Sequence, residues 1–286
     1  EILIGLVGSE MCIRDRTWHG SLGIKRLDGD VVMGFRWKQL AKRCQKTVDY
    51  LLSNSNFETE VFRTAYWKDV PSILVGHARN DIFFIKDQEK VARINKKVHR
   101  FLNIDEDTHI FLFAPTHRDD VDESYQPLNY EMIKEALEER FGGKWQIVIR
   151  LHNRLKKESR SWLNLLPSYV SDATFYEDMQ ELLLCTDVGL TDYSSWIFDF
   201  VLSGKPGFII ELNLEDYENA RGFYYPIDTT PFPIATSSEE LADNIRKFDA
   251  EKYAKDKDVF LAARGCMEDG HASERIVEKI NELMAK

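Results

Sequence analysis

Four groups of polar residues follow apolar runs in this chain, and their side chains are suited to binding phosphate. They are Arg79 after SILVG, Pro115 to Asp119 after IFLFA, Arg150 and His152 after WQIVI, and Thr191 to Ser195 after DVGL. In an open parallel sheet, ligands bind at the edge formed by the carboxyl ends of the strands. Arginine, histidine, serine and threonine at that edge favour a ligand that carries phosphate.

The stretch TDYSSWIFDF carries the most informative of these signals. Ser194 and Ser195 stand where a helix is expected to begin, and the free N–H groups of a helix start can hold phosphate oxygens. Asp199 follows Ser195 by four residues on the same helix face, within reach of a ribose or polyol hydroxyl. The alternative is that a serine or threonine only caps the helix.

Three histidines stand in comparable positions. Arg150 and His152 are two residues apart after a strand, so their side chains share one face. His19 lies in TWHG, where an imidazole in a loop could act as a general base. His117, beside Arg118, is a weaker signal of the same kind. For each histidine, an ordinary loop role is the alternative.

Metal and cofactor motifs are scarce. Asp105 to Asp107 precede their strand, at the wrong sheet edge for a ligand site, and are interpreted as a solvated turn. Asp119 and Asp120 lie at the favoured edge, where a metal site is the weaker interpretation. The four cysteines form no CxxC pair, and the sequence has no GxGxxG, P-loop, HExxH or GxSxG motif. We therefore expect no cofactor, no metal and a reduced, cytoplasmic setting.

Composition describes a globular protein with a substantial core. Hydrophobic residues make up 43% of the 286, charged residues make up 30%, and the net charge is −10. That charge argues against general nucleic-acid binding. Basic residues nevertheless gather at 25–46, 86–100 and 150–157, either as solvated helix faces or as a surface for an anionic ligand or membrane.

Strands alternate with helices over much of the chain. Short apolar runs predict strands at 71–76, 110–113, 144–152, 168–174, 187–190 and 206–211. Amphipathic spacing predicts helices at 37–52, 57–67, 86–101, 129–141, 179–185, 194–204, 237–248 and 273–286, with HARND at 77–81 as a loop. This alternation indicates an α/β protein with a doubly wound parallel sheet.

The motifs TWHG, NSNFETEVFRTAYW, GHARND, FAPTHRDD, RLH, TDYSSWIFDFVLSGKP and DGHASERIVEKI occur in that order. Together they resemble the CDP-glycerol glycerophosphotransferase family, the teichoic acid primases and polymerases of bacterial cell walls. The resemblance runs from Thr17 nearly to the C-terminus. It implies a GT-B-like fold of two Rossmann-type domains. Residues 17–101 would be the C-terminal part of the acceptor-side domain, and 102–286 would be the donor-binding domain with a C-terminal helix.

The resemblance also implies an activity. A hydroxyl of a lipid-linked acceptor, or of a growing poly(glycerol phosphate) chain, would attack the β-phosphate of CDP-glycerol and release CMP. The implied partners are CDP-glycerol, an anionic lipid-linked acceptor and the inner face of the cytoplasmic membrane, with peripheral attachment and no nucleic acid. The oligomeric state does not follow from the sequence.

Individual residues receive roles from the same resemblance. His19 would be the general base, and His152 would stabilise charge on the departing CMP. The donor pocket would be lined by Trp18, Gly20, Ser21 and Leu22. Phosphate would be bound by Arg79, Arg150, Ser194 and Ser195, with Pro115 and Thr116 against the cytidine and Asp199 in contact with the donor.

Some residues depart from the family pattern and leave alternatives open. His77 and Ala78 replace a usual Tyr-Pro, His117 replaces a common aromatic residue, and Asn153 replaces proline. CDP-ribitol or another CDP-polyol is therefore an alternative donor. A GT-B glycosyltransferase that uses a nucleotide sugar, and a non-catalytic donor-binding protein, are further alternatives.

The first residues form a separate problem. The string GLVGSEMCIRDR resembles sequencing adapter translated into protein, so residues 1–16 are expected to be non-native. A GT-B acceptor domain needs more strands and helices ahead of TWHG than 16 residues supply. We expect the N-terminal domain to be incomplete, the alternative being a genuine strand at EILIGLVG.

Overall fold

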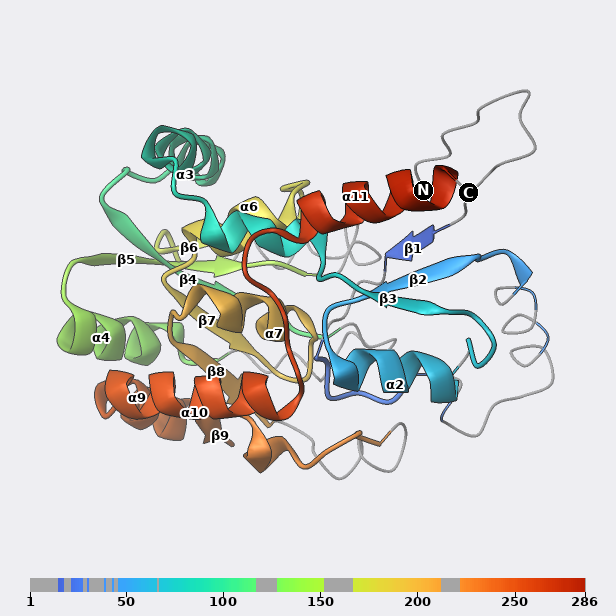
Figure 1. The fold of residues 1–286 in the computed structure, drawn as a ribbon. Helices are drawn as coiled ribbons and strands as arrows, with labels where there is room; N and C mark the ends of the chain where they lie inside the picture. Colours follow the sequence, from blue (N-terminus) through green and yellow to red (C-terminus); the bar gives the residue numbers. More distant parts are fainter. Residues whose placement is uncertain are drawn as a thin grey trace.

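The computed structural model describes residues 15–17, 22–27, 30, 39, 43, 46–65, 67–116, 128–151, 167–211 and 222–285. Its strands form two parallel sheets that lie next to each other (Figure 1). The smaller sheet has the order β1-β2-β3, with bounds β1 (Asp15–Thr17), β2 (Tyr50–Ser53) and β3 (Ser72–Leu74). Its register pairs Arg16 with Leu51 and Leu51 with Ser72.

The larger sheet has six parallel strands in the order β6-β5-β4-β7-β8-β9. Their bounds are β4 (Thr108–Phe113), β5 (Lys144–Ile149), β6 (Val170–Asp172), β7 (Val188–Thr191), β8 (Gly207–Ile210) and β9 (Ile234–Ala235). The strand order reverses between β4 and β7, which is the point of a doubly wound sheet where ligands bind. The predicted α/β class and parallel sheet are confirmed.

Helices cover both faces of the larger sheet. In Figure 1, α3 and α6 lie on one side, and α4, α9 and α10 lie on the other. The α-helices are α2 (Asn56–Ala65), α3 (Gln88–Leu102), α4 (Tyr130–Phe141), α6 (Met179–Cys185), α7 (Trp196–Phe200), α9 (Ser238–Arg246), α10 (Ala250–Ala263) and α11 (Ala272–Met284). The 3₁₀ helices are η2 (Ala78–Phe84), η4 (Val201–Ser203) and η5 (Ile227–Thr229).

Short polar side chains set where most of these helices begin. A capping side chain accepts a backbone N–H of the first turn in α3, α4, α6, α9 and α10, the caps being Asp87, Asn129, Asp178, Ser237 and Asp249. At α2, the Ser55 hydroxyl accepts the Glu58 N–H, and the Glu58 carboxylate accepts the Asn54 N–H. The pattern SNFE favours a reciprocal capping box, and the structure has a variant of it in which Glu58 accepts the N–H of the residue before the N-cap.

The structure differs from the sequence prediction in several places, including β1, which was not predicted. Tyr50 to Ser53 form β2 rather than the end of a helix, because Leu51 and Leu52 are buried between two neighbouring strands. The HARND loop is the start of η2. Neither α10 nor β9 was predicted, since α10 buries only Tyr253 and Phe260 and β9 has two residues.

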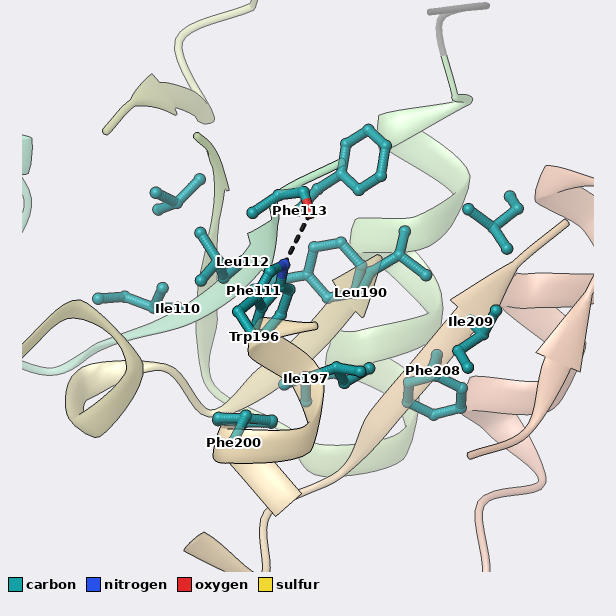
Figure 2. Close-up of a cluster of buried hydrophobic side chains, with 14 of the residues drawn as sticks. Ile110, Phe111, Leu112, Phe113, Leu190, Trp196, Ile197, Phe200, Phe208 and Ile209 are labelled. Atoms are coloured by element: carbon teal, nitrogen blue, oxygen red, sulfur yellow. Dashed lines mark hydrogen bonds between the residues drawn. The ribbon is translucent and has the colours of Figure 1, made fainter. Parts of the chain in front are cut away.

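The core of the larger sheet fixes the loops at its carboxyl edge. Apolar residues of β4, β7 and β8 pack against α7 (Figure 2). A Cβ atom placed on Gly189 in β7 would lie only 2.9 Å from the Phe200 ring of α7. The helix therefore packs directly on the strand, and the loop between them has little freedom.

The end of the chain returns to the smaller sheet. Residues 264–267 run beside 54–57, with hydrogen bonds from the N–H of Asn56 to Gly265 O and from the N–H of Met267 to Asn54 O. The Asp81 carboxylate accepts the N–H groups of Ala272 and Ser273 at the start of α11. The C-terminal segment is thus anchored to elements that precede it by about 190 residues.

Candidate functional site

A cleft of about 1220 Å³ opens at the carboxyl edge of the larger sheet. Its walls come from the loops after β4, β5, β6 and β7, from the start of η2 and from α3. Six of the residues predicted from the sequence line it: Arg79, Pro115, Arg150, Ser194, Ser195 and Asp199. The fold therefore gathers strand ends that are far apart in the chain, while the roles assigned to these residues stay predictions.

Thr116 follows the cleft-lining Pro115 but does not itself line the cleft. Its N–H and its hydroxyl both donate to Asp192 Oδ1, each at 2.7 Å. Lys25 Nζ donates to the Thr116 hydroxyl at 2.8 Å, so a residue 91 positions earlier contacts the turn after β4. The Trp196 indole N–H donates to Ala114 O at 2.8 Å. These bonds fix the turn at Pro115 and Thr116.

Ser194 and Ser195 precede the first turn of α7. Ser195 occupies the N-cap position, but its side chain makes no capping hydrogen bond. Simple capping, the alternative considered for this serine, is therefore not what its hydroxyl does here. Both serines line the cleft, where a hydroxyl can donate to a phosphate oxygen.

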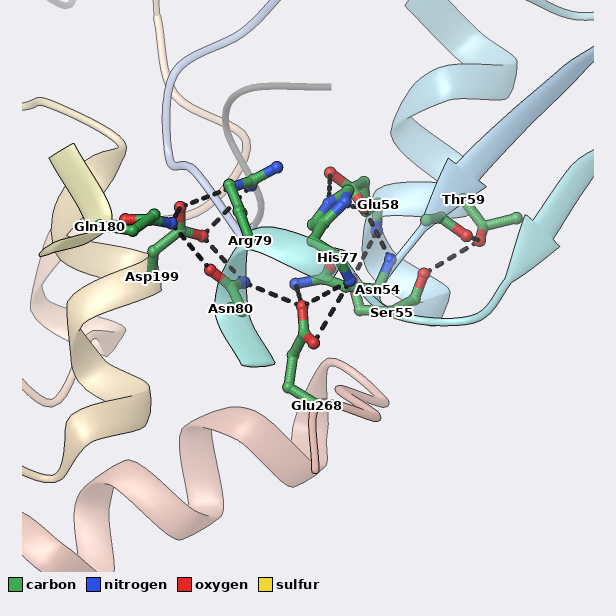
Figure 3. Close-up of polar contacts among 11 residues, drawn as sticks. Asn54, Ser55, Glu58, Thr59, His77, Arg79, Asn80, Gln180, Asp199 and Glu268 are labelled. Atoms are coloured by element: carbon green, nitrogen blue, oxygen red, sulfur yellow. Dashed lines mark hydrogen bonds and ion pairs between the residues drawn. The ribbon is translucent and has the colours of Figure 1, made fainter. Parts of the chain in front are cut away.

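Arg79 and Asp199 form a paired charge in the cleft (Figure 3). Arg79 Nε lies 2.9 Å from Asp199 Oδ2, and Arg79 Nη2 lies 3.3 Å from Asp199 Oδ1. The Arg79 side chain is 24% exposed and that of Asp199 is 6% exposed. Burial alone would lower the pKa of Arg79, but attraction to Asp199 outweighs it and raises that pKa.

This pairing changes what can be expected of Asp199. Both of its carboxylate oxygens accept hydrogen bonds from protein groups, including Gln180 Nε2 at 3.3 Å and Asn80 Nδ2 at 3.3 Å. The sequence predicts a contact between Asp199 and the donor. Asp199 lines the cleft, so that contact stays a prediction, and its hydrogen bonds to Arg79 also orient the guanidinium.

A buried polar cluster continues behind the Arg79–Asp199 pair. His77 and Glu58 are 1% and 2% exposed, and their side chains are hydrogen-bonded, with 2.9 Å between Nε2 of His77 and Oε2 of Glu58. Glu268 accepts the His77 N–H at 3.1 Å and the Asn80 amide at 2.9 Å. Burial raises the pKa of the Glu268 carboxyl, and these hydrogen bonds oppose the rise.

Arg150 is held by the loop that follows β6. Its guanidinium donates to the carbonyl oxygens of Ala173 and Tyr176. Burial lowers the pKa of Arg150, with Asp178 and Asp172 acting in the opposite direction. The guanidinium is half-buried, and the part of the chain that the structure describes places no carboxylate in hydrogen-bond contact with it, which suits it to an anionic ligand.

Sequence reasoning missed one wall of the cleft. It consists of Lys97 and Phe101 from α3 and Tyr176 from the loop after β6. The Phe101 and Tyr176 rings meet edge to face with centroids 5.0 Å apart, and Lys97 pairs with Glu181 at 2.6 Å. The sequence shows that Lys97 and Phe101 share one helix face, but it does not show that this face contacts Tyr176 and Glu181.

Other predicted residues lie elsewhere. Leu22 was expected to line the donor pocket, but its side chain is fully buried in the hydrophobic core. Trp18, His19, Gly20, Ser21 and His152 lie outside the described residues, as do His117 and Asp119. Asp15 and Arg16, within the stretch expected to be non-native, belong to β1, and their origin stays a prediction. Over the described part of the chain, no three histidine, cysteine or acidic residues gather as metal ligands.

The parallel sheets, the reversal of strand order and the cleft lined by two arginines define an α/β, GT-B-like protein. The chain belongs to the CDP-Glycerol:Poly(glycerophosphate) glycerophosphotransferase family, which it matches over residues 10–282. The resemblance read from the motifs is thereby confirmed.

Individual relatives agree with this assignment. The chain is 30% identical over 282 residues to the teichoic acid poly(glycerol phosphate) polymerase of Staphylococcus epidermidis, covering 93% of this chain and 38% of the relative. It is 30% identical over 281 residues to the teichoic acid glycerol-phosphate transferase of Staphylococcus aureus, covering 93% and 70%. The chain thus spans well under half of the first of these relatives.

Solved structures show the same fold. The wall teichoic acid polymerase TagF superposes with a TM-score of 0.74 at 28% identity, covering 93% of this chain and 67% of TagF. A histidine-to-asparagine variant of TagF, soaked with CDPG, gives a TM-score of 0.76 at 27% identity, covering 96% and 69%.

Proposed function

We propose that this chain transfers glycerol phosphate from CDP-glycerol to a hydroxyl of a lipid-linked acceptor or a growing poly(glycerol phosphate) chain, with release of CMP. One observation carries the proposal: two arginines, Arg79 and Arg150, and two serines, Ser194 and Ser195, line a single cleft. The family description names CDP-glycerol and poly(glycerophosphate), which supports this donor and a polymer acceptor.

The chemistry suits the groups in the cleft. The acceptor oxygen forms a bond to the β-phosphorus of CDP-glycerol, and the bond from that phosphorus to the bridging oxygen breaks. CMP leaves with the electron pair of that bond. Such a transfer depends on positioning and on stabilising negative charge, which Arg79 and Arg150 can provide. The proposal keeps His19 as the base that takes the acceptor proton, and His152 as the group that stabilises the departing CMP.

The identity of the donor rests on the relatives. The glycerol-phosphate enzymes above match over 93% of the chain, whereas the teichoic acid poly(ribitol-phosphate) polymerase of Bacillus spizizenii is 27% identical over 80% of it. CDP-glycerol is therefore the proposed donor and CDP-ribitol the second candidate.

Binding and turnover measured side by side test this proposal. The full chain is expected to bind CDP-glycerol more tightly than CDP-ribitol or a UDP-sugar in calorimetry, because its pocket would fit the smaller polyol. Labelled CDP-glycerol with a lipid-linked acceptor should give labelled polymer and CMP. Tighter binding of a UDP-sugar would contradict the proposal, and stoichiometric CDP-glycerol binding without turnover would favour a donor-binding role.

We also propose peripheral attachment to an anionic membrane. Helix α3 exposes a row of basic side chains, namely Lys90, Arg93, Lys96, Lys97 and Arg100. Among the described residues, no helix has the length and hydropathy needed to cross a bilayer. A cationic helix face can instead bind anionic headgroups by electrostatic attraction.

Binding to vesicles should therefore depend on charge. Cosedimentation with phosphatidylglycerol vesicles is expected to fall steeply between about 50 and 500 mM NaCl, because salt screens exposed charges. Replacing Lys90 and Arg93 with alanine should weaken binding roughly 30-fold, at about 1 kcal/mol for each of the two basic residues. Lys252→Ala in α10 is the matched control, since Lys252 is exposed but lies on a different helix. Salt-independent binding would contradict the attachment.

A further inference from the structure

Glu268 belongs to the segment between α10 and α11, far along the chain from the strand ends that form the cleft. Its carboxylate accepts hydrogen bonds from Asn54 Nδ2 at 3.0 Å, from Asn80 Nδ2 at 2.9 Å and from the His77 N–H at 3.1 Å. Both oxygens of a carboxylate are hydrogen-bond acceptors, so one carboxylate can accept all three hydrogen bonds at once. An amide in its place would turn an N–H₂ group towards one of them.

Asn80 connects Glu268 to the cleft. It is completely buried, and its Nδ2 donates both to Glu268 and to Asp199 Oδ1, the latter at 3.3 Å. Its Oδ1 accepts from Gln180 Nε2 at 3.1 Å. Figure 3 shows this amide between Glu268 and the Arg79–Asp199 pair. Buried amides whose donor and acceptor are both satisfied have a fixed orientation.

We infer that Glu268 is a positioning residue of the donor site, acting through Asn80 and Asp199 on the guanidinium of Arg79. Glu268 holds the Asn80 amide, the amide holds one oxygen of Asp199, and both oxygens of Asp199 hold Arg79. The inference takes its ligand, CDP-glycerol, from the proposed function, and the hydrogen-bond chain itself does not depend on that function.

The first test is the affinity of the full chain for CDP-glycerol. Glu268→Ala is expected to weaken it about tenfold, because a small misplacement of a phosphate-binding group has large effects. Glu268→Gln keeps one acceptor oxygen and should show a smaller loss. Asp269→Ala is the matched control: it removes a charge from the same segment, but Asp269 pairs with Arg275 at 2.8 Å. The control should stay within about twofold of wild type.

Coupling separates positioning from a general loss of stability. Asn80→Ala should cause the same loss of affinity as Glu268→Ala, and the double variant should cause no more than either single one. Residues that act in series give such non-additive effects, whereas independent sites add. Additive losses, or an unchanged affinity in Glu268→Gln and Glu268→Ala, would overturn the inference. If the alanine variants fail to fold, Glu268→Gln and Asn80→Ser carry the same comparison.

A second readout does not need a ligand. The Arg79 Nε–H donates to Asp199, so its exchange with water is slow when the pair is held in place. NMR of ¹⁵N-labelled protein, with the signal assigned by Arg79→Lys, should show exchange at least about tenfold faster in Glu268→Gln and unchanged in Asp269→Ala. If wild type fails to bind CDP-glycerol, the proposed function falls and this exchange decides the inference. Unchanged exchange in Glu268→Gln would overturn it.

Discussion

Replacing Arg79 with alanine is expected to weaken CDP-glycerol binding by about 100-fold and to reduce transfer by at least as much. The substitution removes a guanidinium from the cleft and leaves Asp199, which is 6% exposed, without its two-point partner. An unpaired buried carboxylate repels an incoming diphosphate as well as destabilising the fold. Calorimetry with the full chain measures the affinity, and unfolding in urea measures the stability.

Two further variants show whether the charge or its geometry matters at this position. Arg79→Lys keeps the charge but cannot reproduce a two-point contact with Asp199, so about a tenfold loss is expected. Arg63→Ala is the control, because Arg63 is 65% exposed and pairs only with Glu60 on the surface of α2 among its recorded contacts. Affinity of Arg79→Ala within about twofold of wild type would remove Arg79 from the donor site.

Replacing Phe198 with alanine is expected to lower the free energy of unfolding by about 3–5 kcal/mol. Phe198 is 1% exposed and stacks on Phe260 with ring centroids 5.9 Å apart. It also meets Phe232 at 5.6 Å, so its removal leaves a cavity among large rings. Urea unfolding followed by tryptophan fluorescence gives the change directly.

The matched control lies on the same helix as the stacking partner. Val259 precedes Phe260 in α10 but is 69% exposed, so Val259→Ala should change stability by less than about 0.5 kcal/mol. In mild conditions the folded fraction of Phe198→Ala should bind CDP-glycerol normally, because the ring faces the core while Asp199 faces the cleft. A loss below about 1 kcal/mol would mean that the core closes around the gap.

The sequence was most informative where residue type and chain position agree. Apolar runs such as Ile110 to Phe113 end in polar residues, and parallel pairing brings such ends to one edge, so the cleft could be predicted from local patterns. The strand at Tyr50 to Ser53 could not be predicted in this way, because two adjacent leucines are compatible with a helix face and with a buried strand. Tertiary pairing decided between the two.

The polar cluster behind Arg79 was beyond the reach of local patterns. Asp199 was predicted to meet the donor because four residues separate it from Ser195, but its nearest cation comes from a residue 120 positions earlier. Glu268 gave no signal at all, since an acid after a helix is ordinary until the fold places Asn80 beside it. Contacts across 100 or more residues depend on topology rather than on spacing.

The return of the chain end to the smaller sheet has a consequence for how the protein is made. Ribosomes release chains from the N-terminus at about 5–20 residues per second. Roughly 10–40 s therefore separate the synthesis of Asp81 from the synthesis of Ala272 and Ser273, whose N–H groups its carboxylate accepts. A similar time separates the synthesis of residues 54–57 from that of residues 264–267, to which they are hydrogen-bonded. During translation the strands of the larger sheet can therefore pair before residues 264–273 are available to contact the residues around the smaller sheet.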